Sequence, residues 1–454
     1  MSSTLQTLTV SPSPKPLRGV FIVPGDKSIS HRAVILGSLA SGVTHIEGLL
    51  EGEDVLCTVG AMRAMGAKIT RLGLGKWKIV GVGEKGLKQP RGVIDCGNSG
   101  TTLRLLTGLV SGFPIKVTFT GDDSLNSRPM GRVIEPLQKM GARITTTFKE
   151  KNKKGRWITV EGGKLQGGVF KLKVPSAQLK SALLLAGLSS GQPVTVIEPR
   201  GTKSRDHSER MLQGFGATLE VRGARVTLRA GSLLQGRKFV VPGDISSAAF
   251  FIVAGLIHPN KKTRLVLKNV GINPTRTGLL DVLKKMGAHL ALRSIRTVCG
   301  EPVADIVVTP APLRSTKLTA KIMPRLIDEI PIISVAAALA QGRTRIRGAH
   351  ELRIKETDRI RALVAELSRF GVPVKEYEDG LDIIGKGDGG STLAASSCKS
   401  YGDHRMAMSL LILGSVVRGK TEVQDAECIA TSFPSFVSLM KKVGNSLTVK
   451  RILY

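Results

Sequence analysis

One pattern occurs six times along this 454-residue chain: a polar turn leads into an apolar run rich in Ala, Gly and Ser that ends near Gly. After each run comes a β-like stretch such as "VTHIEG", and then an amphipathic segment that ends in a motif such as "MGAKI" (65–69). A Gly after the last apolar residue is typical of a helix C-terminus, and the alternating residues beyond it predict a strand. Units that begin roughly 65–90 residues apart are larger than solenoid repeats of about 20–50 residues, so we predict two domains of three units each. The six runs begin at Pro24, Gly97, Pro175, Pro242, Asp328 and Tyr401.

The turns before the apolar runs carry the charge. In "VPGDKSISHRAVILGSLASG" (23–42), Lys27 and Arg32 lie at the start of a predicted helix. The N-terminus of a helix has partial positive charge, which disfavours cations there unless an anion compensates. Helices this small and apolar can be buried on all sides, and three parallel ones would place their N-termini on one face of each domain. The pattern therefore indicates an anion site built from several turns, with a solvated, salt-bridged loop as the alternative.

Composition limits the function classes. The net charge is +32, from 67 Lys and Arg against 35 Asp and Glu, which favours polyanions or small multiply charged acids as partners. Aromatic residues make up only 4% of the chain, which leaves few side chains for stacking on nucleic-acid bases. The five cysteines are dispersed without a CxxC pair, which indicates reduced thiols in a cytoplasmic protein rather than disulfides or a zinc site. The longest apolar run, 248–257, is too short to span a membrane, and the N-terminal segment does not read as a signal peptide.

Six motifs, in order from about residue 18 to the end, resemble those of the 5-enolpyruvylshikimate-3-phosphate (EPSP) synthase family in its class II form. They are "PGDKSISHRA", "GNSGTTLRLL", "NSRPMGR", "PSAQLKSA", "IKETDRI" and "YGDHRMAMS". The resemblance implies the α/β enolpyruvyl transferase fold (inverse α/β barrel), with six βαβαββ-type units, three per domain around buried parallel helices. It also implies that residues 1–24 and 242–454 form one discontinuous domain and 25–241 an inserted one, with the active site in the cleft between them.

The reaction implied by the resemblance is transfer of the enolpyruvyl group of phosphoenolpyruvate to the 5-hydroxyl of shikimate 3-phosphate, with release of phosphate. The family uses no metal and no cofactor. We expect small-molecule substrates only, no specific nucleic acid, no membrane and a monomer. Because the two predicted domains are joined by only two chain crossings, we also expect domain motion, with shikimate 3-phosphate favouring a closed state that binds phosphoenolpyruvate more tightly.

The resemblance assigns residues to each substrate. Lys27 is placed between both substrates, and Arg32 offers a fork to a carboxylate. Gly100 would let the backbone approach a phosphate closely, although a packing glycine is the alternative. Arg128 precedes Pro129, which predicts an extended conformation for it. The shikimate 3-phosphate ligands implied are Lys27, Ser28, Arg32, Ser176, Ala177, Gln178, Arg205, Asp328 and Lys355. The phosphoenolpyruvate ligands implied are Lys27, Gly100, Arg128, Gln178, Arg359 and Arg405.

The catalytic residues implied are Lys27 and two carboxylates. Glu356 would protonate C3 of phosphoenolpyruvate, and Asp328, in "LIDEIP", would accept the proton of the 5-hydroxyl. On spacing alone, "RIKETDR" predicts an exposed charged helix in which Lys355 and Arg359 are i,i+4 neighbours. In "YGDHRMA", His404 is interpreted as a structural histidine.

Two positions follow class II rather than class I. Class I has a second Ser at the position of Ala177 and a lysine at the position of Thr431 in "CIATSFP", so we assign no catalytic lysine there.

Two other functions fit part of the sequence. The related UDP-N-acetylglucosamine enolpyruvyl transferase carries a reactive Cys on the loop that corresponds to 121–132, and this loop has none. A nucleic-acid binder would account for the charge, but the sequence shows neither exposed aromatics nor a known binding module.

Overall fold

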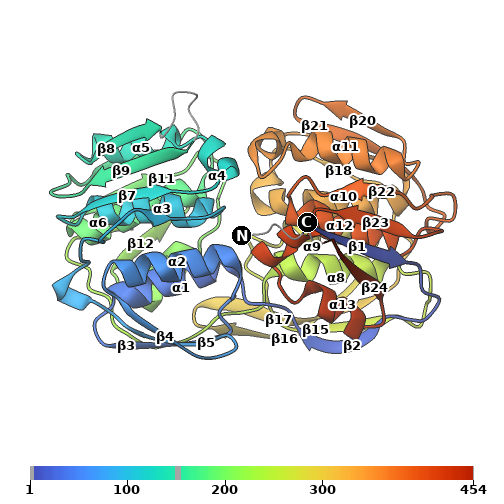
Figure 1. The fold of residues 1–454 in the computed structure, drawn as a ribbon, viewed down its shortest axis with the longest axis horizontal. Helices are drawn as coiled ribbons and strands as arrows, with labels where there is room; N and C mark the ends of the chain where they lie inside the picture. Colours follow the sequence, from blue (N-terminus) through green and yellow to red (C-terminus); the bar gives the residue numbers. More distant parts are fainter. Residues whose placement is uncertain (1–4, 149–154, 453–454) are drawn as a thin grey trace. The chain divides into compact units, whose positions relative to one another are not determined.

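The computed structural model describes residues 5–148 and 155–452, and the chain divides into two compact units. Unit 1 comprises Met1–Pro24, Pro242–Thr297 and Pro302–Tyr454, and unit 2 comprises Gly25–Val241 and Val298–Glu301 (Figure 1). The chain thus passes between the units after Pro24 and after Val241. The short segment Val298–Glu301 also belongs to unit 2, which no sequence feature had indicated.

Within residues 5–148 and 155–452, each unit holds three four-stranded sheets of one design. In every sheet the first two strands run parallel, and the third runs antiparallel to the second. The sheets of unit 2, in spatial order, are β14 (Lys238–Val240), β3 (Val43–Glu47), β5 (Lys76–Val80), β4 (Lys68–Gly73); β6 (Ile94–Asp95), β7 (Lys116–Thr120), β9 (Arg156–Glu161), β8 (Arg143–Phe148); and β10 (Gly168–Lys171), β11 (Val194–Ile197), β13 (Arg225–Leu228), β12 (Leu219–Arg222). Those of unit 1 are β2 (Arg18–Ile22), β15 (Arg264–Gly271), β17 (Glu301–Thr309), β16 (His289–Val298); β18 (Lys317–Leu318), β19 (Gln341–Ile346), β21 (Gly380–Lys386), β20 (Val374–Tyr377); and β22 (Ser397–Lys399), β23 (Thr421–Gln424), β1 (Leu5–Ser11), β24 (Ser446–Ile452).

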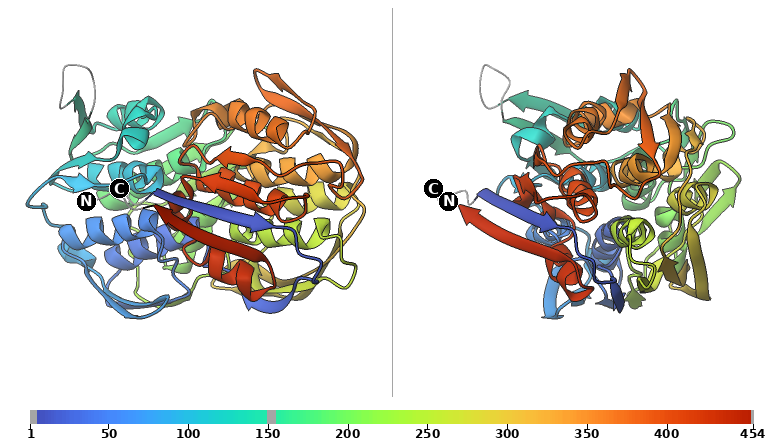
Figure 2. Two further views of the ribbon diagram at one scale, coloured as in Figure 1. Left: turned by 45° about the vertical axis from the view of Figure 1, so that its right-hand side comes forward. Right: turned by 90° about the vertical axis from the view of Figure 1, so that its right-hand side faces the viewer.

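Three sheets are completed by strands from distant parts of the chain. β2, which precedes the first crossing, pairs with β15 in unit 1, and β14, which precedes the second crossing, pairs with β3 in unit 2. β1 lies between β23 and β24, so the two ends of the chain share one sheet; Figure 2 shows β1 beside β24. Each unit therefore closes on itself through backbone hydrogen bonds, which explains why both crossings follow a strand.

All six apolar runs form buried helices, as predicted. In unit 1 every residue of α8, α10 and α12 is buried, and α1, α3 and α6 of unit 2 are buried along most of their length. Small residues allow this packing: a Cβ on Gly108 of α3 would lie only 2.3 Å from the carbonyl oxygen of Ala182 on α6. The six are α1 (Lys27–Leu39), α3 (Gly100–Ser111), α6 (Ala177–Ser190), α8 (Ile245–Ile257), α10 (Ile330–Leu339) and α12 (His404–Gly414).

In each of the six repeats a second helix follows the buried helix and covers the sheets with one apolar face. These helices are α2 (Glu53–Ala64), α5 (Gly131–Lys139), α7 (His207–Gly214), α9 (Gly278–Lys285), α11 (Arg359–Arg369) and α13 (Phe436–Lys442). A short additional helix, α4 (Asp123–Ser127), precedes α5. The buried apolar residues form two separate clusters, one in each unit. The six-unit α/β fold expected from the sequence is confirmed. No helix among the described residues has the length and apolar character needed to cross a membrane.

Candidate active site

The first turn of α1 holds the cations that the sequence singled out. Asp26 caps the helix by accepting a hydrogen bond from the backbone N–H of Ile29 at 2.9 Å. The Lys27 ammonium lies 2.8 Å from Oδ2 of Asp54 on α2, a partner that sequence reasoning missed. The backbone carbonyl of Ser28 accepts from Nη1 of Arg32 at 2.9 Å. The turn thus fixes both cations near the start of the helix.

Arg32 is almost fully buried, and its partners are neutral. Its Nε donates to Oγ of Ser208 at 2.7 Å and its Nη2 to Oγ of Ser181 at 2.6 Å. Burial lowers the pKa of the Arg32 guanidinium to about 10, the carboxylates of Glu209 and Asp26 act against this shift, and the positive charge of Arg205 reinforces it. Arg32 and Arg205 therefore lie in one another's electrostatic field, as expected for two cations that share an anion.

The start of α3 forms a second cationic turn. Ser99 caps the helix through the N–H of Thr102, and a Cβ on Gly100 would lie 3.0 Å from Nη1 of Arg104 and 3.3 Å from Nη1 of Arg128. Two guanidinium groups thus converge on a glycine at a helix N-terminus, where backbone N–H groups also favour anions. The contacts are with flexible side-chain ends, which favours the anion-binding interpretation of Gly100 over the packing one. Arg128 has the extended backbone that Pro129 predicts, and its Nη2 donates to Oδ1 of Asn98 at 2.6 Å.

Arg104 was missed by sequence reasoning. It donates through Nη1 to Oε1 of Gln178 at 2.8 Å, and Nε2 of Gln178 donates to the hydroxyl of Thr101 at 3.1 Å. The signal was present in "TTLRLL", where a cation stands one helical turn after Gly100 in an otherwise apolar run. Gln178 therefore joins the start of α6 to the start of α3.

Ser176 and Ala177 form the start of α6. The Ser176 side chain accepts from the N–H of Leu179 at 3.3 Å and so caps the helix. The carbonyl of Ala177 accepts from the hydroxyl of Ser181, one of the two serines that hold Arg32. Unit 2 thus gathers the predicted cations and polar groups at the starts of three buried helices.

In unit 1, Arg359 lies at the centre of a cluster of acids. Its Nε donates to Oδ2 of Asp403 at 2.7 Å, and its Nη2 donates to Oε2 of Glu356 at 2.7 Å. Oδ1 of Asp328 lies 3.6 Å from its Nη1 and 3.2 Å from the ammonium of Lys355. Although burial opposes the charged form, the carboxylates of Asp403, Glu356 and Asp328 raise the pKa of Arg359. The structure thus brings the predicted acids and cations of this unit together.

The predicted helix through "RIKETDR" is wrong in part. A 3₁₀ turn covers His350–Ile354, and α11 begins only at Arg359, with Asp358 as its cap. The capping carboxylate accepts from the N–H of Arg361 at 3.1 Å, so the chain between Lys355 and Asp358 is irregular. Lys355 and Arg359 converge on Asp328 from this turn rather than from neighbouring positions of a helix.

Arg405, in the first turn of α12, completes the cluster. Its Nη1 donates to the backbone carbonyl of Asp328 at 3.0 Å and lies 3.7 Å from Oε1 of Glu329. Asp403 caps α12 as well as pairing with Arg359, and both Asp403 and Glu329 were missed by sequence reasoning. In "YGDHR" and "IDEIP" the sequence pattern indicates Arg405 and Asp328 instead, because a capping residue and a carboxylate beside an apolar run also occur in ordinary helices. His404 is buried and Thr431 ends a 3₁₀ turn.

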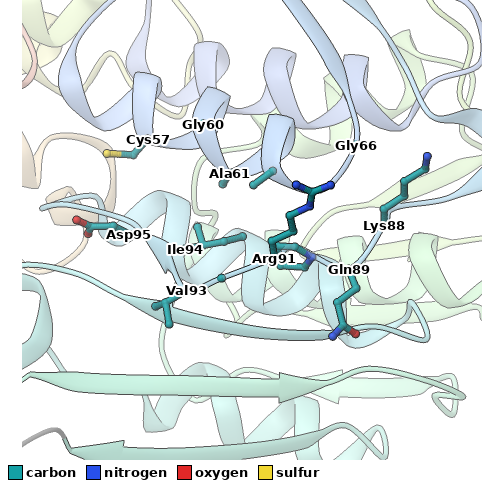
Figure 3. Close-up of a pocket in the computed structure, with 13 residues that line it drawn as sticks. Cys57, Gly60, Ala61, Gly66, Lys88, Gln89, Arg91, Val93, Ile94 and Asp95 are labelled. Atoms are coloured by element: carbon teal, nitrogen blue, oxygen red, sulfur yellow. The ribbon is translucent and has the colours of Figure 1, made fainter.

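Unit 2 also has a surface hollow of about 560 Å³ between α2 and the segment 88–95 (Figure 3). Lys88, Gln89 and Arg91 line it together with small residues of α2, and none of the predicted site residues does. At its edge, burial and the nearby Asp54 and Asp95 raise the pKa of the Cys57 thiol to about 11. Among the described residues, no group of three or more His, Cys, Asp or Glu side chains is arranged to hold a metal ion.

Comparison with known proteins gives the family of this chain. Residues 12–440 match the family model described as EPSP synthase (3-phosphoshikimate 1-carboxyvinyltransferase). The chain is 50% identical over 439 residues to the 3-phosphoshikimate 1-carboxyvinyltransferase of Citrifermentans bemidjiense, a match that covers 97% of this chain and 99% of the relative. It is 49% identical to that of Geobacter metallireducens, with 97% of this chain and 100% of the relative covered.

Solved structures show the same fold. The EPSP synthase of Acinetobacter baumannii superposes with a TM-score of 0.86 at 42% identity, covering 98% of this chain and 100% of that one. The enolpyruvyl transferase NikO of Streptomyces tendae, at 16% identity and a TM-score of 0.73, covers 99% of this chain and 100% of that one, and shares the fold alone. With half of its residues identical to curated relatives over nearly their whole length, this chain belongs to the EPSP synthase family, the 3-phosphoshikimate 1-carboxyvinyltransferases.

Proposed function

We propose that the clusters of unit 1 and unit 2 act on the same pair of substrates in the reaction of this family. The chain transfers the enolpyruvyl group of phosphoenolpyruvate to the 5-hydroxyl of shikimate 3-phosphate, giving 5-enolpyruvylshikimate 3-phosphate and phosphate. This step belongs to the shikimate pathway, which leads to chorismate and the aromatic amino acids. Each substrate carries both a phosphate and a carboxylate, and neither cluster alone offers both an anion cradle and a pair of acids.

In this proposal unit 2 binds the phosphate of phosphoenolpyruvate and most of shikimate 3-phosphate. The phosphate of phosphoenolpyruvate lies at Gly100, between Arg104 and Arg128 and against the N-terminus of α3. Shikimate 3-phosphate takes the hydroxyl, amide and cationic groups around Arg32. Lys27 lies between the two substrates as a point charge and stabilises the charge that develops during addition and elimination. The support for this half is the convergence of two guanidinium groups on Gly100. The shikimate 3-phosphate contacts proposed here are Lys27, Ser28, Arg32, Ser176, Ala177, Gln178 and Arg205.

Unit 1 supplies the proton transfers. Glu356 gives a proton to C3 of phosphoenolpyruvate, which makes C2 cationic, while Asp328 takes the proton of the attacking 5-hydroxyl. Glu356, now a carboxylate, takes a proton back from C3 of the tetrahedral adduct as the bond between C2 and the phosphate oxygen breaks and phosphate leaves. Lys355 lies 3.2 Å from Asp328, where it can hold that carboxylate toward the hydroxyl. Arg359 and Arg405 bind the carboxylate of phosphoenolpyruvate.

One contact sets the order of events. Glu356 accepts a hydrogen bond from Arg359 at 2.7 Å, and an ion pair with a guanidinium favours a carboxylate over a carboxylic acid. The carboxylate of phosphoenolpyruvate therefore replaces Glu356 at Arg359 before Glu356 acts as an acid. Substrate binding itself prepares the proton donor.

The test is release of phosphate from phosphoenolpyruvate and shikimate 3-phosphate by the purified protein. Phosphate should appear only when both substrates are present, and the organic product should carry the enolpyruvyl ether at O5. Release of phosphate from phosphoenolpyruvate alone, or an equal rate with UDP-N-acetylglucosamine as acceptor, would refute the proposal.

Binding of the two substrates is coupled in this proposal. If both units contact shikimate 3-phosphate, binding it favours the state that also binds phosphoenolpyruvate, and by linkage each ligand tightens the other equally. Calorimetry with each ligand, alone and in the presence of the other, measures this coupling. Independent binding would refute the shared site while leaving the family assignment intact.

The cellular setting is also proposed: a cytoplasmic monomer that needs no cofactor. The five cysteines are free thiols, which fits a reducing compartment. Light scattering on the purified protein tests the monomer, and a mass of two chains would contradict it.

A further inference from the structure

A buried cluster of three charges in unit 2 has no part in the proposed chemistry. Lys180 of α6 is completely buried, and its ammonium lies 2.9 Å from Oε2 of Glu198 and 2.7 Å from Oε1 of Glu209. Both carboxylates are buried as well. Removing three charges from water costs several kcal/mol per ion before their attraction is counted. A contribution to folding stability is therefore a weak explanation for such a cluster. The contacts of the cluster do hold several elements of unit 2 in place.

The cluster joins three separate elements at one ammonium group. Lys180 lies on α6 two residues after Gln178, Glu198 directly follows β11, and Glu209 lies in the first turn of α7. A second link runs parallel to it, because the hydroxyls of Ser181 and Ser208 are 2.6 Å apart. The neighbouring pairs in "KS" (180–181) and "SE" (208–209) thus fasten α6 to α7 by an ion pair and by a hydrogen bond.

Besides pairing with Lys180, Glu198 accepts hydrogen bonds from the loop that follows it. Its Oε1 and Oε2 accept hydrogen bonds from the backbone N–H of Ser204 at 3.1 Å and 3.2 Å. These bonds close the loop from 198 to 204, and the next residue is Arg205. The position of the Arg205 backbone is therefore tied, through one carboxylate, to the Lys180 ammonium on α6.

Glu209 acts on Arg32 through charge. Although burial raises the pKa of Glu209 itself, among neighbouring charges Glu209 is the strongest that favours the charged form of Arg32, whereas Arg205 opposes it. Two cations placed to share one anion repel each other while that anion is absent. The Glu209 carboxylate offsets this repulsion at Arg32 and lets Arg32 and Arg205 stay close together.

We infer that Lys180, Glu198 and Glu209 form a positioning cluster that sets Arg205 and Arg32 in place for shikimate 3-phosphate. The inference rests on the proposed function, in which those two arginines contact that substrate. None of the three residues touches a reacting atom in this account. Their effect appears in the affinity for one substrate and leaves the chemical step unchanged.

The decisive experiment couples Glu198 to Arg205. Glu198→Gln retains the size of the side chain and one acceptor oxygen, but it removes the charge and the second acceptor for the Ser204 N–H. We expect the KM for shikimate 3-phosphate to rise about tenfold, as for the loss of a charge-assisted hydrogen bond, with kcat and the KM for phosphoenolpyruvate within about twofold. In the Arg205→Ala background the same change should have no further effect, because its target is gone.

A variant in which all three residues of the cluster are neutral tests the inference without leaving a buried charge unpaired. Lys180→Met alone leaves two buried carboxylates unpaired, so it should lower the free energy of unfolding strongly. The triple variant Lys180→Met, Glu198→Gln, Glu209→Gln has no unpaired charge and should fold, yet show a rise in KM for shikimate 3-phosphate at least as large as that of Glu198→Gln, because it also removes the Glu209 charge that supports Arg32. The matched control is Lys116→Met with Glu161→Gln, an exposed ion pair of the same unit at 2.8 Å, which should change neither constant.

The outcomes separate the inference from the proposed function. If Arg205→Ala leaves the KM for shikimate 3-phosphate unchanged, the proposed contact at Arg205 is wrong. If Arg205→Ala raises this KM but Glu198→Gln does not, or if the two effects add fully, the positioning role is wrong. A Glu198→Gln variant whose kcat falls as much as its affinity, or that fails to fold, would also overturn it, because the cluster would then be structural only.

Discussion

Arg32 in unit 2 and Arg359 in unit 1 are both buried guanidinium groups, but their surroundings are opposite. Arg32 donates to two serine hydroxyls and a backbone carbonyl, and burial lowers its pKa. Arg359 faces the carboxylates of Asp403, Glu356 and Asp328, which raise its pKa against the effect of burial. Carboxylates of the protein compensate the charge of Arg359, whereas the groups that accept hydrogen bonds from Arg32 are neutral.

This difference divides the work between the units. Neutral partners hold a guanidinium in place without cancelling its charge, which in the proposed function preorganises unit 2 for anionic substrates. Carboxylate partners cancel charge and place acids beside the substrate, so unit 1 is suited to proton transfer. The comparison predicts that changes in unit 2 act mainly on binding, whereas changes in unit 1 act mainly on turnover and stability.

The largest effect is expected at the acids of unit 1. Asp328→Ala and Glu356→Ala should each lower kcat by about 10²–10⁴, the usual range for loss of a general acid or base. The affinity for shikimate 3-phosphate should survive better in Glu356→Ala, because Asp328 is the carboxylate proposed to lie at the substrate's hydroxyl. Steady-state kinetics with both substrates measure this, with Glu422→Gln, a half-buried acid of the same unit that pairs with Lys420, as the control. Near-normal turnover in both variants would remove the two carboxylates from the mechanism.

A stability comparison tests the two arginines directly. Arg359→Met leaves Asp403 buried without its cation and should lower the free energy of unfolding by about 3–5 kcal/mol. Arg32→Met leaves the hydroxyls of Ser181 and Ser208 bonded to each other, so we expect a change within about 1 kcal/mol. Urea unfolding of the two variants and the wild type measures both values.

A second measurement compares the two variants in the presence of ligand. Shikimate 3-phosphate should raise the Tm of the wild type, and Arg32→Met should lose most of this rise because it lacks the guanidinium proposed to pair with the anionic substrate. Equal losses of stability in the two variants without ligand would contradict the comparison.

Gly100→Ala should have a smaller effect, confined to one substrate. The new methyl group would lie 3.0–3.3 Å from Nη1 of Arg104 and of Arg128, so both guanidinium groups must shift away from the helix N-terminus. We expect the KM for phosphoenolpyruvate to rise about tenfold, which corresponds to 1.4 kcal/mol, with little change for shikimate 3-phosphate. Gly60→Ala on α2, where a Cβ would meet nothing within 4 Å, is the matched control. An equal rise for both substrates would show that the turn serves general packing.

Thiol modification should have the smallest effect, because neither unit places a thiol in its cluster. Burial raises the pKa of Cys57 to about 11 and those of Cys398 and Cys428 to about 12, so these thiols stay protonated at pH 8 and become nucleophilic only in strong alkali. Treatment with iodoacetamide at pH 8 should leave activity intact. Stoichiometric inactivation that phosphoenolpyruvate prevents would contradict this and would favour the cysteine-dependent relative.

The sequence predicts the repeat and the helices well because both depend on local patterns. Each polar turn followed by small apolar residues forms a buried helix, and the caps at Asp26, Ser99 and Ser176 are readable from residue type. The turn from Lys355 to Asp358 is where local pattern fails. Its charges fit an exposed helix, but Asp358 caps α11 instead, and ion pairs with Asp328 hold Lys355 and Arg359.

The sequence by itself determined the helices and strands, and the residue types at the starts of the buried helices, because propensity, capping and periodicity act within a few residues. Tertiary structure alone decided which charges meet. Arg104 contacts Gln178 across 74 positions of the chain, and Asp403 contacts Arg359 across 44. Lys180 contacts both Glu198 and Glu209, which lie up to 29 positions away. The energy of such pairs depends on distance and burial, and neither quantity can be read from the order of residues. The same fact explains why Arg32 and Arg359, alike in sequence as cations beside a helix start, differ in whether the protein itself satisfies their charge.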